Sequence, residues 1–240
     1  MNRFITLVLC CTISIACLGQ KDRTQILDSL LSSLHEKNMF NGNVLIAENG
    51  KAIFEKSYGV ADESDQRPLN TKTVFELASV SKQFTAMAIV LLEKDQQLSI
   101  EDPISKYIPE LAFLPSISIK NLLQHTSGLP DYMELFDKHW DKRQFAVNQD
   151  IVDMLVKQQV VLNFEPGEEF EYSNTGYALL GLIIEKASGM EYGSYLEKKV
   201  FKPLGMKNTQ VYRSRYAPEK IKNYALGYLA NDFGIKVSPD

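Results

Sequence analysis

Two stretches of this sequence contain long apolar runs and are long enough to form helices, and they constrain the fold more than any other feature. Residues 79–93 include an unbroken apolar run from 86 to 92. Residues 177–187 have the same character, and Ser188 and Gly189 follow as a typical helix C-terminus. A helix that is apolar nearly all round is a buried helix. We therefore expect two buried helices.

A β-hairpin is predicted ahead of the first of these helices. Residues 43–48 and 51–58 are rich in β-prone side chains, and Asn49 and Gly50 join them. Asn-Gly is the strongest short-range signal for a tight hairpin, because both turn positions need a positive φ. Residues 22–37 place leucine and isoleucine at helical spacing and predict an amphipathic helix. The chain is therefore α+β.

Further elements are expected along the rest of the chain. The polar residues 62–72 contain Pro68 and predict a loop. Three more helices are predicted, over residues 119–124, 149–158 and 191–200. Some short strands are predicted after Thr209. This leaves a sheet with few strands, and a two-stranded hairpin is only marginally stable alone.

The N-terminus has the form of a secretory signal peptide. Arg3 is followed by an apolar run over residues 4–18, which is short for a membrane span. We expect cleavage before Gln20, which leaves residues 20–240 as one exported domain. An imperfect lipobox at residues 14–17 keeps a lipoprotein anchored at Cys17 open as the alternative.

Charge and composition exclude several classes of function. The net charge is −4 and the charges are scattered, so no basic stripe indicates a nucleic-acid partner. The three cysteines all lie in the predicted signal peptide, so a cysteine nucleophile and thiolate metal ligands are excluded from the mature domain. The three histidines show no metal-binding spacing, and we expect neither a metal nor a cofactor.

Ser79 and Lys82 form an S-x-x-K motif at the start of the first apolar helix. If Ser79 opens that helix, Lys82 lies one turn later on the same face. A serine hydroxyl is a weak nucleophile that needs a nearby group to accept its proton. A helix N-terminus also favours the negative charge of an oxyanion. An ordinary helix cap beside a solvated lysine explains the motif equally well when it is taken alone.

Tyr172 and Asn174 lie between a Pro-Gly turn and the second apolar helix, so we expect them on a loop. A phenol has a reference pKa near 10, and a neighbouring cation such as Lys82 would favour its ionised form. Tyr172 could then accept the Ser79 proton and later activate water. The Asn174 amide both donates and accepts, which suits it to hold Lys82 and a substrate amide together. A plain polar turn is the alternative.

Several segments, taken in order, resemble class C β-lactamases and the wider group of β-lactamase-related serine hydrolases. They are residues 75–86, 121–129, 166–177 and 202–209. The resemblance covers about residues 25–231. It implies a β-lactamase/transpeptidase-like fold, in which an antiparallel sheet packs against helices and a helical lobe. It also implies acyl-enzyme chemistry, with Ser79, Lys82 and Tyr172 as catalytic residues and Asn174 in substrate binding.

The sequence departs from that family in one respect. Members carry a third motif, Lys-Thr-Gly or His-x-Gly, on a later strand, and neither form follows Tyr172 here. That strand usually supplies an oxyanion donor, and loss of one such donor costs about 10²–10³ in rate. We expect that C-terminal strands are missing and that the sequence is a fragment of a longer protein rather than an inactive short form.

Two functions remain open at this point. The first is an exported serine acyl hydrolase that acts on β-lactams, D-Ala-D-Ala-type peptides or small esters. The second is a catalytically silent module that binds such ligands without turnover. The expected partner is a small molecule or a cell-wall peptide. Membrane contact is expected only if Cys17 is lipidated, and the sequence does not indicate an oligomeric state. His125 is interpreted as a structural, hydrogen-bonded residue rather than a base.

Overall fold

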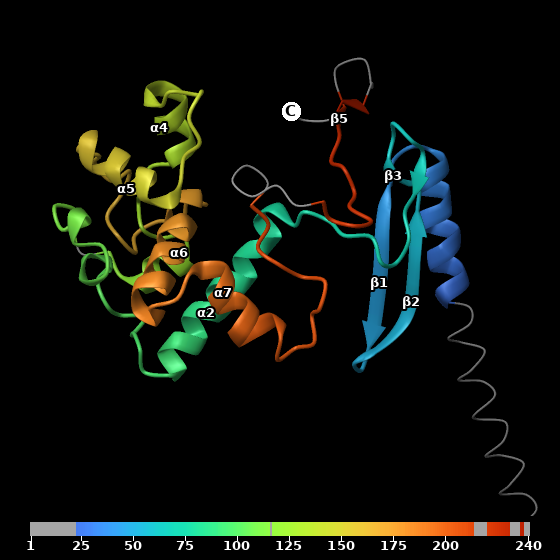
Figure 1. Ribbon diagram of the computed structural model, residues 1–240, viewed down its shortest axis with the longest axis horizontal. Helices are drawn as coiled ribbons and strands as arrows, with labels where there is room; N and C mark the ends of the chain where they lie inside the picture. The colour runs from blue at the N-terminus through green and yellow to red at the C-terminus, as the bar shows by residue number, and fades with distance from the viewer. Residues whose placement is uncertain (1–22, 116, 214–219, 231–235, 238–240) are drawn as a thin grey trace, which may run out of the picture. The chain divides into compact units, whose positions relative to one another are not determined.

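The computed structural model describes residues 23–115, 117–213, 220–230 and 236–237, so the predicted signal peptide lies outside the described residues. The chain divides into two compact units. Met1–Glu76 and Lys220–Asp240 form the first, which we call the sheet unit, and Leu77–Glu219 forms the second, the helical unit (Figure 1). Within the described ranges, no helix has the length and apolar character needed to cross a membrane.

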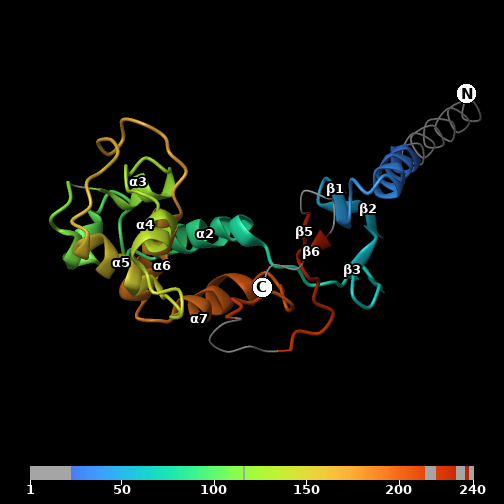
Figure 2. The same cartoon turned by 90° about the horizontal axis from the view of Figure 1, so that it is seen from above.

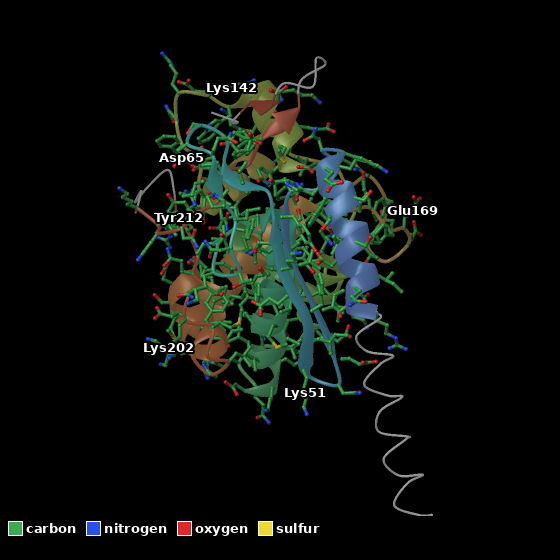
Figure 3. The ribbon with its side chains drawn as sticks, turned by 90° about the vertical axis from the view of Figure 1, so that its right-hand side faces the viewer. Lys51, Asp65, Lys142, Glu169, Lys202 and Tyr212 are labelled. Atoms are coloured by element: carbon green, nitrogen blue, oxygen red, sulfur yellow. The ribbon has the colours of Figure 1, made fainter. Side chains whose placement is uncertain are left out.

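The hairpin of the sheet unit forms as predicted. β1 (Gly42–Glu48) pairs antiparallel with β2 (Lys51–Tyr58). Asn49 and Gly50 connect the strands with φ angles of 51° and 74°. Both residues can adopt this left-handed conformation at low cost, which explains the position of the turn. Figure 3 shows Lys51 at the tip of this hairpin.

A helix over residues 23–36 packs beside the hairpin, in agreement with the predicted helix over 22–37 (Figure 1). Its Asp28 carboxylate accepts hydrogen bonds from Lys56 and Tyr58 on β2. Burial, and then the adjacent Asp28 carboxylate, raise the pKa of Tyr58 to about 12. Asp28 therefore ties the helix to the second strand of the hairpin.

The loop predicted over residues 62–72 is partly wrong. β3 (Val60–Asp62) and β4 (Arg67–Pro68) pair antiparallel there. Pro68 can occupy a strand because a short edge pairing does not need its missing N–H. Short strands after Thr209 are present as expected, since β5 (Leu229–Ala230) pairs antiparallel with β6 (Lys236–Val237).

Two helices form the centre of the helical unit. α2 (Lys82–Lys94) packs against α6 (Asn174–Ser188), and both helices are visible in Figures 1 and 2. α6 confirms the prediction of a buried helix. Its buried residues are Thr175, Gly176, Leu179, Leu180, Gly181, Leu182, Ile183 and Ile184. It ends at Gly189, whose φ of 66° gives the expected left-handed C-cap.

α2 corrects the other half of that prediction. Within the helical unit it buries Ala88, Ile89 and Leu92, yet Met87 and Val90 are 48% and 51% exposed. An apolar run shows that a helix can be buried on all sides. Which sides are buried depends on the segments that pack against it. Only one side of α2 belongs to the core of this unit.

Shorter helices surround this pair. They are α3 (Ile119–Leu123), α4 (Tyr132–His139), α5 (Asn148–Lys157) and α7 (Tyr192–Leu196), with 3₁₀ segments at Ala78–Ser81, Ile104–Lys106 and Pro109–Leu111. The predicted helices at 119–124 and 149–158 are confirmed. The one at 191–200 changes to a π-helix, Glu197–Phe201, after α7. α4 was not predicted.

The core around α6 gives a stability prediction. Leu179 is fully buried, whereas Leu204 is 69% exposed in the same unit. We expect Leu179→Ala to lower the free energy of unfolding by about 2–5 kcal/mol, because it removes buried area and leaves a cavity. Leu204→Ala, the matched control, should change it by less than about 0.5 kcal/mol. Urea unfolding of both variants measures the difference, and equal losses would contradict this description of the core.

Candidate active site

Ser79 lies in a tight turn that leads into α2, not in the α-helix itself. The 3₁₀ segment Ala78–Ser81 contains it, and α2 begins at Lys82. This corrects the expectation that Ser79 opens the helix. The Lys82 N–H donates to the Ser79 carbonyl, which is the i to i+3 bond of a 3₁₀ turn. Side chains three residues apart eclipse one another in such a turn, so Ser79 and Lys82 still become neighbours.

Ala78 adopts a left-handed conformation directly before the serine, with a φ of 45°. This conformation is unfavourable for a residue with a Cβ atom and costs about 1–3 kcal/mol when the surrounding structure enforces it. The Ser81 hydroxyl donates to the Ala78 carbonyl at 2.6 Å and helps to hold the turn. The backbone at Ala78 therefore fixes the direction in which Ser79 is presented.

Three side chains converge at the Ser79 hydroxyl. The Tyr172 hydroxyl donates to Ser79 Oγ at 2.8 Å, and Lys82 Nζ lies 3.4 Å from the same atom. Lys82 Nζ also donates to Asn174 Oδ1 at 3.0 Å. The structure thus brings together all four site residues predicted from the sequence, although Tyr172 is 93 residues from Ser79 in the chain.

Lys82 lies against aromatic faces as well as polar groups. Its Nζ is 4.9 Å from the centroid of the Tyr172 ring and 5.5 Å from that of the Tyr177 ring. A cation at this distance is attracted to the ring quadrupole. The aromatic contacts and the Asn174 carbonyl together hold the amine beside Ser79.

The surroundings of Tyr172 change its acidity. Lys82, and next the hydrogen bond with Ser79, lower the pKa of Tyr172 from its ordinary value of 10, while Asp131 has a smaller opposing effect. A nearby positive charge stabilises the phenolate. Tyr172 therefore ionises more readily than a free tyrosine.

The start of α6 sets the positions of Tyr172 and Asn174. Ser173 caps the helix, because its hydroxyl accepts from the Gly176 N–H at 3.0 Å. Asn174 is consequently the first residue of α6 rather than part of a loop, while Tyr172 precedes the cap without regular structure. A hydroxyl residue at this position is a strong start signal for a helix.

His125 holds the segment that carries Tyr172. Its carbonyl accepts from the Glu171 N–H at 2.9 Å, and its Nδ1 accepts from the Ser173 N–H at 3.0 Å. Its ring lies 4.7 Å from the Tyr172 ring and 5.0 Å from the Tyr177 ring. These contacts agree with the interpretation of His125 as a structural, hydrogen-bonded residue, and they add a ring contact with Tyr172 at an interplanar angle of 31°.

The turn after His125 is hydrogen-bonded to the loop over residues 163–171. The Asn163 N–H donates to the Gly128 carbonyl at 2.8 Å, and Gly128 has a φ of 69°. A Cβ atom at Gly128 would lie 2.1 Å from the Phe164 carbonyl oxygen. Only glycine fits this approach. Figure 3 shows Glu169 on the outer part of the same loop.

Sequence reasoning missed Asp131. Its carboxylate accepts from Asn174 Nδ2 at 3.1 Å and also caps α4 through the Met133 N–H at 2.8 Å. An aspartate ahead of a helix would have indicated the cap. No sequence signal indicates the contact with Asn174, which lies 43 residues further on. Among the described residues, no group of His, Cys, Asp and Glu side chains is arranged to hold a metal ion.

The comparison with known proteins defines the class of this protein. A protein-family model described as Beta-lactamase matches residues 27–235, and the chain belongs to that family. The predicted resemblance and the predicted α+β fold of the β-lactamase/transpeptidase type are thereby confirmed.

Particular relatives show how far the similarity extends. The chain is 47% identical over 210 residues to penicillin-binding protein 4* of Bacillus subtilis (strain 168), covering 88% of this chain and 46% of that protein. Its structure is similar to that of EstCE1, a hydrolase with promiscuous acyltransferase activity (TM-score 0.76, 25% identity, 93% of this chain and 65% of that one). It is also similar to a class C β-lactamase (TM-score 0.72, 28% identity, 92% of this chain and 58% of that one). The chain thus spans less than half of the Bacillus protein.

The His125 contacts give a prediction about pH. Burial, and then the Lys82 charge, lower the pKa of His125 from its ordinary value of 6.5. Between 6.5 and the lowered pKa, the unfolded chain binds more protons than the folded one. The stability contributed by neutral His125 should therefore be complete above pH 6.5 and decrease as the pH falls toward the lowered pKa.

The variant His125→Asn tests this prediction. Asparagine supplies an acceptor for the Ser173 N–H and does not titrate. It also tolerates the positive φ of residue 125, which is 59°. Urea unfolding measures the free energy of unfolding between about pH 7.5 and 5, a range chosen around the reference pKa of histidine. As the pH falls, this free energy should decrease less steeply for His125→Asn than for the parent. Identical slopes would show that His125 is not the responsible group. The two proteins differ at this residue alone, so every other titrating group is common to both.

Proposed function

We propose that this chain carries the catalytic serine of an exported serine acyl hydrolase. Ser79 is the nucleophile, Tyr172 its proton acceptor, Lys82 the charge that lowers the Tyr172 pKa, and Asn174 the residue that holds Lys82 and a substrate amide. The observation that carries this proposal is the 2.8 Å hydrogen bond between Tyr172 and Ser79, with Lys82 Nζ 3.4 Å from the same oxygen.

The first step is attack of Ser79 Oγ on a substrate carbonyl carbon. When Tyr172 is ionised, the direction of its hydrogen bond reverses, and Ser79 donates its proton to the phenolate as the new C–O bond forms. The carbonyl π electrons move to the carbonyl oxygen. The positive end of α2, which begins three residues after Ser79, favours that negative charge.

Tyr172 then returns the proton. As the tetrahedral intermediate collapses, the bond to the leaving group breaks and the Tyr172 hydroxyl protonates the departing atom. This leaves an ester on Ser79 and a phenolate at Tyr172. Water attacks the ester with Tyr172 again as the base, which releases the acid and restores Ser79.

The substrate class is proposed from chemistry and from the relatives. Penicillin-binding protein 4* is named for penicillin, and EstCE1 is described as a hydrolase with acyltransferase activity. The second description names transfer of an acyl group. We include β-lactams, D-Ala-D-Ala-type peptides and small esters as substrates. Export follows from the form of residues 1–19, with anchoring through a lipidated Cys17 as the alternative to secretion.

Intact-mass spectrometry after incubation with a fluorescent penicillin and with p-nitrophenyl acetate tests the proposal. The protein should gain the mass of one acyl group, and Ser79→Ala should gain none. An adduct on Ser79 excludes the silent binding module. A parent protein that binds both probes without forming an adduct supports that module and overturns the hydrolase.

The role of Tyr172 predicts a specific pH profile. Tyr172→Phe should lower the rate of acylation about 10²–10⁴-fold, the usual contribution of a general base. In the parent, the rate should rise as the pH increases through the lowered pKa of Tyr172, hence below pH 10. That rising limb should be absent from the Phe variant.

Stopped-flow release of nitrophenolate measures both effects. Tyr107→Phe serves as the matched control, since Tyr107 bonds Asp102 away from Ser79, and it should retain the parent profile. A Tyr172→Phe variant with the full rate and the same rising limb would assign the proton transfer to another group.

A further inference from the structure

Asn174 presents a different chemical group to Lys82 and to Asp131. Its Oδ1 accepts from Lys82 Nζ at 3.0 Å, and its Nδ2 donates to Asp131 Oδ2 at 3.1 Å. An ammonium has donors only and an ionised carboxylate has acceptors only. The side-chain amide is therefore satisfied in one orientation, and a flip would oppose donor to donor at Lys82 and acceptor to acceptor at Asp131.

Asp131 is itself held in place. Its Oδ1 accepts from the Met133 N–H at 2.8 Å and caps α4, while Oδ2 faces Asn174. Its backbone has the extended conformation of an N-cap residue, with φ −70° and ψ 124°. The helix cap thus fixes the carboxylate before it contacts Asn174, so little further ordering is needed.

A second link holds this segment against the start of α6. The Thr175 hydroxyl donates to the Pro130 carbonyl at 2.7 Å, and the Tyr132 N–H donates to the same hydroxyl at 2.8 Å. Thr175 is fully buried. The residues on both sides of Asp131 are therefore hydrogen-bonded to Thr175, the residue after Asn174. These bonds keep the Asp131 carboxylate next to the Asn174 amide.

We propose that Asp131 is a positioning residue, which fixes the orientation of the Asn174 amide and thereby holds Lys82 beside Ser79 and Tyr172. The inference rests on the function proposed above. Asp131 acts on Lys82 through Asn174, apart from the small direct effect of its charge on the pKa of Tyr172. Without its carboxylate, Asn174 can turn its NH₂ group toward Lys82, and the amine then loses the acceptor that places it.

Asp131→Asn tests the proposal with little change in shape. Asparagine caps helices as well as aspartate does, so the thermal midpoint should stay close to that of the parent. The rate of Ser79 acylation by p-nitrophenyl acetate should fall about 10²-fold, because small displacements of catalytic groups have effects of this size. The dependence on Asn174 separates positioning from a general structural role. In an Asn174→Ala background, Asp131→Asn should change the rate by only about twofold.

Asp150→Asn is the matched control. Asp150 also accepts a backbone hydrogen bond at a helix start, from the Val147 N–H, and its loss should leave acylation at the parent rate. If the parent is acylated and Asp131→Asn reacts equally fast, the positioning role is wrong and the proposed function stands. The positioning role is also wrong if Asp131→Asn lowers the acylation rate by the same factor in the parent and in the Asn174→Ala background. If neither p-nitrophenyl acetate nor a fluorescent penicillin acylates the parent, both proposals fail.

Discussion

The hydrogen bond between Lys82 and Asn174 joins the first residues of two helices that are far apart in the sequence. α2 and α6 pack against one another through buried aliphatic side chains, so the position of each helix start follows from the packing of the whole pair. Hydrophobic packing has no directional preference and cannot by itself align two polar side chains. The turn before α2 and the cap before α6 provide that alignment, and the chemistry of the site depends on both.

The parts of the fold that were predictable are those with a local cause. Asn49 and Gly50 specify the hairpin because only a tight turn needs two consecutive positive φ angles. Gly189 ends α6 for a related reason. The pairing of β3 with β4 was not predicted, because the segment is polar and contains Pro68, and because contacts with residues distant in sequence also hold it. The Arg67 side chain, for example, donates to the Tyr224 carbonyl, 157 positions away.

The sequence predicts which residues make up the candidate site, but not which residues hold them in position. Ser79, Lys82, Tyr172 and Asn174 stand in motifs whose spacing or neighbours indicate chemistry. His125 and Asp131 determine where those side chains lie, yet each does so through a fold-dependent contact. The His125 ring lies against Tyr172 because its carbonyl accepts from the Glu171 N–H and its Nδ1 accepts from the Ser173 N–H. Asp131 meets Asn174 only because α4 begins beside α6. Neither arrangement follows from the residue types alone.

The left-handed backbone at Ala78 helps to set the direction of the side chain of Ser79, the proposed nucleophile. A branched side chain there would oppose the required φ far more strongly than a methyl group does, and relaxation of the turn would rotate the serine away from the tyrosine. Glycine would accept the geometry but would leave the turn freer to adopt others. Alanine is the compromise between these demands. The backbone conformation at position 78 therefore restricts which residue can stand directly before the proposed nucleophile.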